Sequence, residues 1–422
     1  MTFISNKEKF IFFQIPVFLF SALPFFLITG PLLSDLTISF ISLFFLIYCF
    51  KRKDFSYFNN RYFYFFFLFW IYLVINSLIN NINFDSLKIS FFYFRYGVFI
   101  IAVTAMLKTN AKFIEHFFYC ILFCFVGLIA DGFYQYFFGE NILGWEKHKL
   151  RISSFFGDEL ILGSYLSRLW PIFFGLFIII FNKKDKFFFL LIFIFILTEV
   201  LIFLSGERAA FFYINFSAIF LILLSKKLFR IRLITMLASF FLIISISFFI
   251  PEAKQRIVDH TINQMNLFNK NKGEKKYIFS KEYSQIYESA YKMYLDNKLL
   301  GVGVKNFRNF CNKEKYKVSE ISCHSHPHNT YIQILTEIGI IGFLFLLVAL
   351  FYFCKSIFKH LFLKFRRDNY FSDFEICILS GIAIYLWPLV PTGNVFNNWL
   401  NIILILHIPF LIWSKSLPIN SK

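Results

Sequence analysis

The sequence predicts an all-α integral membrane protein with about twelve transmembrane helices and a large helical periplasmic loop. Of its 422 residues, 58% are hydrophobic and only 16% are charged, whereas a soluble protein has roughly 25% charged residues. The apolar residues form long runs, and the basic residues gather in alternate short connections between them. A soluble fold of this length would lack the polar surface to cover itself, so the composition excludes a soluble enzyme, a disordered protein and a secreted disulfide scaffold.

The apolar runs define the expected spans, because a spanning helix needs about 20 mainly apolar residues. A tetrapeptide at 205–208, Ser-Gly-Glu-Arg, interrupts the run from 187 to 225 and predicts a helical hairpin with a tight turn. No small-residue cleavage signature follows the first run, which we therefore interpret as a retained span. The candidate spans are 11–29, 32–50, 62–79, 87–107, 114–138, 160–181, 187–205, 208–225, 232–250, 331–354, 374–391 and 398–414.

The distribution of Lys and Arg predicts the topology, since short cytoplasmic loops carry an excess of these residues. The basic connections are 51–61, 108–112, 182–186, 226–232 and 355–367, whereas 30–31, 80–85, 206 and 392–398 hold almost none. This alternation places both termini in the cytoplasm. It divides the protein into spans one to nine (1–250), a periplasmic loop (251–330) and spans ten to twelve (331–422). The net charge of +18 then reflects topology, and no nucleic-acid partner is expected.

The long loop carries helical patterns of its own. One amphipathic helix is predicted by Tyr283, Ile286, Tyr287, Ala290, Tyr291 and Tyr294, and a weaker one by Ile257, Thr261, Met265 and Phe268. These helices could form a cap that lies on the membrane or a lid over a site in the bundle, and we favour the lid. Cys311 and Cys323 are the two cysteines outside the apolar runs, so a disulfide between them is expected in an oxidising compartment.

Five ionisable residues fall inside predicted spans, where charge is costly and usually functional. They are Arg95, Asp131, Arg168, Glu199 and Glu337. At 1.5 Å rise per residue, each lies roughly 10–13 Å below the outer end of its span. They could form five independent structural pairs, or they could line one water-accessible cavity that opens to the outside, which we favour. No comparable polar path continues to the inner side, and this argues against a transporter.

Three histidines alternate just before the tenth span, at His324, His326 and His328. With Cys323 they could bind zinc, but ligands at every second residue suit an extended strand, and here a helix is expected to begin at Asn329, a good N-cap. The positive end of a helix dipole disfavours the charged form of a histidine placed there. A neutral imidazole is what a general base requires. We therefore predict that His328 is a general base and that no metal is bound, with a structural histidine as the remaining alternative.

His328-Asn329 is followed by nine residues and then by Gly339-Ile340-Ile341-Gly342. Small residues at this spacing let helices approach closely, but the whole signature resembles that of the O-antigen ligase superfamily. That superfamily includes lipid-linked-oligosaccharide ligases, O-antigen polymerases and some protein O-oligosaccharyltransferases. Three further segments are similar to it in the same order, and the resemblance covers about 145–345. They are an Arg-containing loop at 151–157, a Ser-Gly-x-Arg turn at 205–208 and a segment at 297–307 ending in Gly-x-Gly-x-x-Phe.

The resemblance implies a metal-independent, inverting glycosyltransferase of lipopolysaccharide and cell-envelope biosynthesis that needs no cofactor. It would move a glycan from undecaprenyl pyrophosphate to a lipid A–core acceptor or another glycan acceptor at the periplasmic face, in contact with membrane lipid. The alternatives are an O-antigen polymerase, which takes a lipid-linked repeat as acceptor, a protein O-oligosaccharyltransferase and, less favoured, a flippase for lipid-linked glycan.

Residue roles follow from the same resemblance and from the chemistry of pyrophosphate departure. His328 would accept the acceptor's proton, and Arg208 would stabilise the departing pyrophosphate by bidentate contacts. For Arg208 the alternative is a charge that merely reaches the membrane interface. The expected substrate-binding residues are Arg151, Asn329, Tyr331, Lys305, Arg95 and Arg168, and Gly339 and Gly342 form the structural motif.

Overall fold

The computed structural model describes residues 6–80, 84–110, 112–181, 188–226, 228–265, 279–366, 368 and 370–416. The described residues form helices and turns, with no β-structure beyond two isolated bridges. The fold class predicted from composition is therefore confirmed as all-helical.

Ten helices follow the first nine predicted spans in order, and the fourth span is divided between α4 and α5. They are α1 (Asn6–Phe26), α2 (Pro31–Arg52), α3 (Arg61–Asn80), α4 (Phe84–Phe92), α5 (Phe94–Thr109), α6 (Phe113–Phe138), α7 (Leu162–Ile180), α8 (Phe188–Leu204), α9 (Arg208–Leu224) and α10 (Phe229–Phe249). The predicted hairpin at 187–225 is confirmed, because α8 and α9 meet at a turn in which Gly206 has φ +70°.

The helices have the length and composition of membrane spans. Among the described residues, seven helices are long and apolar enough to cross a membrane, with α4 and α5 counted together, and four shorter apolar helices accompany them. Many large apolar side chains lie on the outside of the bundle, including Phe241 and Phe248, whose exposed fractions are 70% and 79%. Such a surface suits contact with lipid, since soluble proteins rarely expose large apolar patches.

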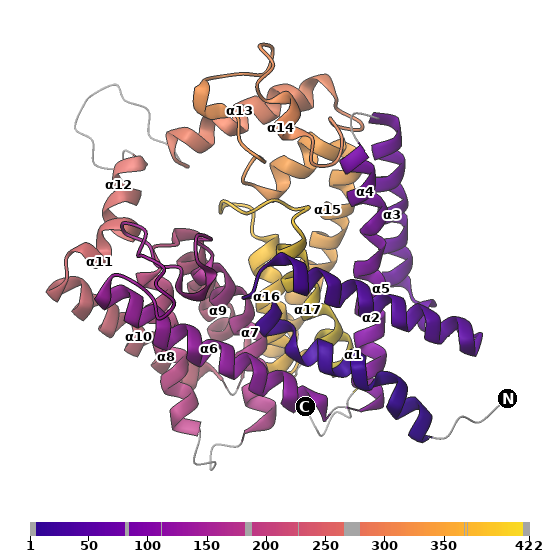
Figure 1. Ribbon diagram of the computed structural model, residues 1–422, viewed down its shortest axis with the longest axis horizontal. Coiled ribbons are helices and arrows are strands. Elements are labelled where there is room, and N and C mark those ends of the chain that lie inside the picture. Colours follow the sequence, from indigo (N-terminus) through magenta and orange to yellow (C-terminus); the bar gives the residue numbers. More distant parts are fainter. Residues whose placement is uncertain are drawn as a thin grey trace.

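A small helical layer, residues 279–329, covers one end of the bundle, and we call it the cap. It contains α13 (Lys281–Asp296) and α14 (Phe307–Phe310), which lie over the end of α15 (Thr330–Phe365) (Figure 1). The predicted amphipathic helix is confirmed as α13, whose Ile286, Ala290 and Met293 are buried. These residues form a separate hydrophobic cluster with, among others, Phe307 and Cys311 of the cap.

Two other expectations concern this region. Cys311 and Cys323, expected to pair, are joined by a disulfide with their Cα atoms 5.0 Å apart. The weaker helix is divided into α11 (Glu252–Lys254), a π-helical turn (Gln255–Asp259) and α12 (His260–Gln264). Of the residues that predicted it, Phe268 lies outside the described residues.

The long helix α15 is kinked at Gly339, which has φ 63° and ψ −171°. The cap segment 298–303, which we call the strap, crosses α15 at this kink and forms backbone hydrogen bonds with it. Val302 N donates to Thr336 O at 3.0 Å, Gly303 N to Glu337 O at 2.8 Å, and Ile340 N to Lys298 O at 2.9 Å. A Cβ on Gly339 would lie 2.2 Å from Leu299 O, so a glycine is required where the strap crosses the helix.

The predicted span 374–391 was wrong in its length. Helix α16 (Asp373–Leu386) stops at Leu386, and the chain continues as a non-helical segment before α17 (Asn398–Ser414). Backbone carbonyls of this segment bond to the side chains that begin α15, as described below. Hydrophobicity alone did not reveal this, because 387–391 is as apolar as the helix before it.

The favoured expectation of one cavity shared by five charged residues was also wrong, and the alternative of separate local partners describes the structure. Each charge has its own set of neighbours. These are Asp35 for Arg95, Asn141 and Ser154 for Asp131, the rings of Tyr213 and Tyr385 for Arg168, Arg232 and Ser239 for Glu199, and Gln333 with the amides of Lys305 and Phe307 for Glu337. Arg232 had been assigned to a basic loop, yet its side chain is buried against Glu199 and Trp170.

Candidate active site

His328 lies where the cap meets the start of α15, and its backbone is held in an unusual conformation. Its φ is 56°, a left-handed value that costs a non-glycine residue of order 1–3 kcal/mol and often marks a functional site. The carbonyl of His328 accepts a 2.8 Å hydrogen bond from Thr392 N, and Asn329 begins the helix directly after it. These flanking contacts fix the imidazole between cap and bundle.

The half-buried ring of His328 contacts three other rings. Its centroid lies 4.0 Å from that of His326, 5.4 Å from that of His324 and 5.6 Å from that of Tyr283. Burial, and secondarily the charge of His324, lowers the pKa of His328 to about 4, so the imidazole is neutral at pH 7. Neutrality was expected from the helix dipole; burial is the larger cause in the structure.

His326 is engaged with the protein at both nitrogens. Its Nδ1 lies 2.9 Å from Ser325 Oγ and its Nε2 lies 3.3 Å from Thr392 O. A carbonyl can only accept, so Nε2 carries the proton and Nδ1 accepts from the serine hydroxyl. Burial lowers the pKa of His326 to about 3. Neither nitrogen of this ring offers a free lone pair to a substrate.

Asn329 is the N-cap of α15, as expected. Its Oδ1 accepts from Tyr331 N at 3.0 Å and Ile332 N at 3.2 Å, and its Nδ2 donates to Pro388 O at 2.8 Å. With its carbonyl oxygen fully occupied, the side chain suits positioning of the helix start better than contact with substrate. Tyr331, another expected substrate-binding residue, likewise donates its hydroxyl proton to Leu386 O at 2.6 Å.

The segment 386–395 therefore surrounds the His-Asn motif, and the sequence did not predict this. Besides the contacts to Leu386, Pro388 and Thr392, Val395 N donates to Gln333 Oε1 at 3.0 Å. One irregular segment thus holds His326, His328, Asn329 and the next turn of α15. A Pro-containing break near the end of an apolar run was the only signal available.

Three arginines lie near enough to Tyr283 to interact with it electrostatically, and so does Glu282. Arg151, Arg208 and Arg256 all interact electrostatically with Tyr283 and with one another. The stems of Arg151 and Arg256 lie against Gly206, since a Cβ there would meet the Cγ of each at 3.1 Å. The Ser-Gly-x-Arg turn thus brings the three side chains together, with Gly206 leaving the space for two of them.

None of these three guanidinium groups forms an ion pair with a carboxylate in the described part of the chain. Arg208 donates to Gln264 Oε1 at 2.6 Å and Arg151 to Leu160 O at 2.7 Å. The Nε atoms of Arg151 and Arg256 are buried without a hydrogen-bond partner. Burial, with the neighbouring charge of Arg256, lowers the pKa of Arg151.

The nearest buried carboxylate, Glu207, is already satisfied by the backbone. Its two oxygens accept from Gly163 N at 2.6 Å and Ser164 N at 3.0 Å, at the start of α7. Burial raises the pKa of Glu207. The cluster therefore keeps an excess of positive charge, which is the arrangement that binds phosphate oxygens.

The sequence analysis named Arg151 and Arg208 but missed Arg256. Arg256 lies in the π-helical turn Gln255–Asp259, a rare conformation that often occurs at functional sites. Nothing in its sequence neighbourhood distinguishes it from the other basic residues of the long loop. Only the turn at Gly206 and the packing of α10 place it beside the other two.

The remaining expected substrate-binding residues lie elsewhere. Arg168 is buried between the rings of Tyr213 and Tyr385, 4.5 Å from each centroid. Arg95 and Lys305 line a separate cavity between the cap and α4–α5. The structure therefore joins His328 with Arg151, Arg208 and Arg256 through Tyr283, and it separates Arg95, Arg168 and Lys305 from them.

The fold defines a multi-pass membrane protein, and the site combines a neutral imidazole with a cluster of unpaired arginines. A family model described as O-antigen ligase matches residues 189–347. That segment contains the turn at Arg208, the cap and both halves of the His-Asn and Gly-x-x-Gly signature, and over it the chain is similar to the O-antigen ligase family, in agreement with the resemblance of its motifs. Members of this family are glycosyltransferase-like enzymes that act on lipid-linked glycans. No curated protein matches the chain.

Proposed function

We propose that this protein is an inverting glycosyltransferase that moves a glycan from undecaprenyl pyrophosphate to a hydroxyl of a lipid A–core acceptor. The observation that carries the proposal is the position of Tyr283, whose ring centroid lies 5.6 Å from that of His328 and which interacts electrostatically with the three arginines. A general base and a pyrophosphate site must lie this close together, because the attacked carbon is bonded to the leaving oxygen.

The transfer needs one proton acceptor and one anion site. The acceptor hydroxyl gives its proton to His328 while its oxygen bonds to the anomeric carbon. The bond from that carbon to the pyrophosphate oxygen breaks, and its electron pair leaves with the pyrophosphate. Arg208, Arg151 and Arg256 stabilise the negative charge that develops there. Attack opposite the leaving group inverts the anomeric carbon, and the activated donor makes a nucleotide, metal or other cofactor unnecessary.

The donor itself would strengthen the base. In the free protein the pKa of His328 is lowered to about 4, so the ring is neutral but a weak proton acceptor. A pyrophosphate bound by the nearby arginines adds negative charge and favours the imidazolium. The pKa of His328 should therefore rise when the donor binds, toward the neutral range in which general bases are most effective.

The acceptor distinguishes the alternatives within this class. An O-antigen polymerase would use a second lipid-linked repeat, and a protein O-oligosaccharyltransferase a serine or threonine hydroxyl. Deletion of the gene and electrophoresis of the lipopolysaccharide separate the first two. Loss of all long chains on the core supports the ligase, whereas a single repeat on the core supports the polymerase. A flippase is disfavoured, because it would not require the base and the arginines at one site.

The proposed topology has twelve spans, both termini in the cytoplasm of a bacterial inner membrane and the cap in the periplasm. It rests on the alternation of basic loops and on the helices that follow the predicted spans in order, although α16 ends at Leu386. A green fluorescent protein fused to the C-terminus should fluoresce, because this protein folds in the cytoplasm. Fluorescence only from a periplasm-competent variant would reverse the orientation.

The direct test is transfer in vitro by the purified protein in nanodiscs, with lipid-linked donor and lipid A–core. Arg256→Ala should weaken donor use, because it removes one of the three guanidinium groups that we expect to bind the pyrophosphate. The sequence had not identified this residue. Arg230→Ala, a basic residue at the start of α10 on the same chain segment, is the matched control and should leave transfer unchanged. Equal activity in both variants would remove Arg256 from the site.

A further inference from the structure

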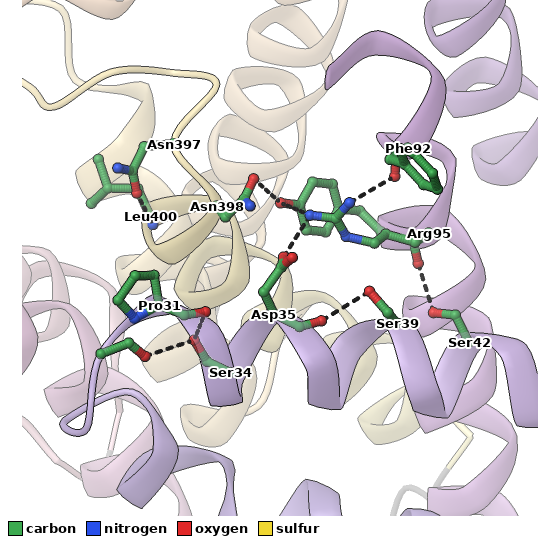
Figure 2. Close-up of polar contacts among 12 residues, drawn as sticks. Pro31, Ser34, Asp35, Ser39, Ser42, Phe92, Arg95, Asn397, Asn398 and Leu400 are labelled. Carbon is green, nitrogen blue, oxygen red and sulfur yellow. Dashed lines mark hydrogen bonds and ion pairs between the residues drawn. The ribbon is translucent and has the colours of Figure 1, made fainter. Parts of the chain in front are cut away.

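A polar cavity lies between the cap and the helices α4 and α5. It has a volume of about 350 Å³ and opens between α4, α5, the cap segment 305–309 and the start of α17. Figure 2 shows its Arg95 wall, where Asp35 of α2 and Asn398 of α17 lie near Arg95. The sequence analysis expected Arg95 and Lys305 to bind substrate, and this cavity contains both.

Positive charge dominates the walls. Lys88, Arg95, Lys305 and Arg308 line the cavity, whereas Asp85 is its one acidic lining residue. Lys88, Lys305 and Arg308 form no ion pair within the described residues. These three cations are therefore available to an anion from outside.

Arg95 is held in place by its neighbours. Its Nη2 donates to Asp35 Oδ1 at 2.5 Å, and its guanidinium carbon lies 4.9 Å from the ring centroid of Tyr96. The hydroxyl of Tyr96 in turn donates to Asn398 Oδ1 at 3.1 Å (Figure 2). The buried Nε of Arg95 has no hydrogen-bond partner.

Lys305 is also positioned by the backbone. Its φ is 59°, and its amide donates to Glu337 Oε2 at 3.0 Å, directly below the strap. Burial, with the charge of Arg308, lowers the pKa of Lys305. A half-buried lysine beside an arginine is a costly arrangement of charge that a bound anion would stabilise.

The cavity adjoins the apolar outer surface and lies within reach of the active site. Phe92 lines it, and both Phe91 and Phe92 are more than half exposed on the outside of the bundle. Phe396 also lines it, four residues after Thr392, which bonds to His328. Four extended residues span at most about 14 Å. A ligand seated here could keep acyl chains in the membrane and reach His328 with its glycan.

We propose that this cavity binds the phosphate-bearing sugar of an acylated acceptor, a role that rests on the glycosyltransferase function proposed above. The cations bind phosphate oxygens, since charge-assisted hydrogen bonds to phosphate are the strong ones. The amides of Asn309 and Asn398 and the neighbouring rings provide surface for the sugar. The donor's pyrophosphate has its own cationic cluster on the other side of His328, so the two substrates approach the base from different sides.

Binding in nanodiscs of phosphatidylcholine tests this proposal without requiring transfer. The probe is diphosphoryl lipid A, compared with the same lipid after removal of its phosphates. The wild type should bind the phosphorylated form more tightly. The double variant Lys305→Gln, Arg308→Gln should lose about a hundredfold in affinity for it, because each of the two removed charge-assisted bonds is worth roughly a factor of ten. Lys315→Gln, which pairs with Asp296 away from the cavity, is the control and should bind like the wild type.

Three results would overturn the proposal. The first is an unchanged affinity in the double variant, and the second is equal binding of the dephosphorylated lipid. The third is displacement of the probe by phosphatidylglycerol added to the nanodisc, which would assign the cavity to phospholipid headgroups. In transfer assays the double variant should raise the KM for acceptor and leave that for donor unchanged. If the wild type bound the probe but catalysed no transfer, the proposed function would fail while the cavity's ligand class would stand.

Discussion

Substitution of Gly339 by alanine should disconnect the cap from α15. Gly339 has φ 63° and ψ −171°, a region that is essentially restricted to glycine and costs another residue about 1–3 kcal/mol. Its new Cβ would also lie 2.2 Å from Leu299 O and 2.6 Å from Leu300 N. These are backbone atoms, so the strap must move away as a unit.

The size of the effect follows from the bonds that the strap makes. Three backbone hydrogen bonds join it to the kink, donated by Val302, Gly303 and Ile340. Each contributes about 1 kcal/mol net, so their loss and the backbone strain together give about 4–6 kcal/mol. Loss of the strap also frees the loop that carries Lys305 and loosens α13, which carries Tyr283. Activity should therefore fall even in the molecules that stay folded.

Two other glycines provide matched controls. At Gly342 a Cβ would meet only side-chain atoms of Ile338, the nearest at 2.4 Å, so alanine there should cost the 1–3 kcal/mol or so that overpacking usually costs. At Gly127 the nearest atom is 3.8 Å away, on Phe155, and alanine in mid-helix should stabilise by about 0.5–1 kcal/mol.

The assay combines thermal unfolding in detergent with hydrogen exchange of the amides of Val302, Gly303 and Ile340. The expected order of stability is Gly127→Ala, then Gly342→Ala, then Gly339→Ala, with fast exchange of the three amides only in the last. If Gly339→Ala unfolded at the same temperature as Gly127→Ala, with protected amides, the account of the strap would be refuted.

Four further predictions concern the site and the cap. His328→Ala should reduce transfer by about 10²–10⁴-fold, whereas His326→Ala should cost much less and chelators should have no effect; equal losses restored by zinc would support a metal site instead. Because His328 must be neutral to accept a proton, kcat/KM should fall as the pH drops through about 4, and kcat should fall at a higher pH, since bound pyrophosphate raises the pKa; coincident profiles would contradict this coupling. Arg208→Lys should lower kcat more than it raises KM for the donor, because lysine keeps the charge but loses the bidentate geometry; a wild-type kcat would remove Arg208 from the site. Purified, denatured, unreduced protein should show five free thiols, since Cys311 and Cys323 are paired and the other five cysteines are free, and a count of seven would exclude the disulfide.

Much of the fold was determined by local properties that the sequence displays directly. The structure contains the helices that were predicted from the apolar runs, from the break at 205–208 and from the helical spacing of apolar residues in α13. These were predictable because the length and period of the apolar pattern in a helix depend on neighbouring residues alone. The N-cap at Asn329 was predictable for the same reason, since its side chain bonds to amides two and three residues later. The His-Asn and Gly-x-x-Gly signature also predicted the family whose model matches residues 189–347.

Tertiary packing decided which charged and polar side chains lie together, because these residues are far apart in the sequence. No pattern along the chain showed that Arg256 would lie beside Arg151 and Arg208. Arg256 and Arg151 can approach each other only because Gly206 has no side chain. The expectation of one cavity lined by five charges failed because each charge has separate neighbours, for example the loop residue Asn141 for Asp131 and Gln333 of the same helix for Glu337. Hydropathy predicted that the helix α16 continues beyond Leu386. It could not show that the carbonyls of Pro388 and Thr392 accept hydrogen bonds from Asn329 and His326. The sequence by itself thus determined the helices and the family resemblance of residues 189–347, whereas the neighbours of each charged group depended on long-range contacts, which no local pattern records.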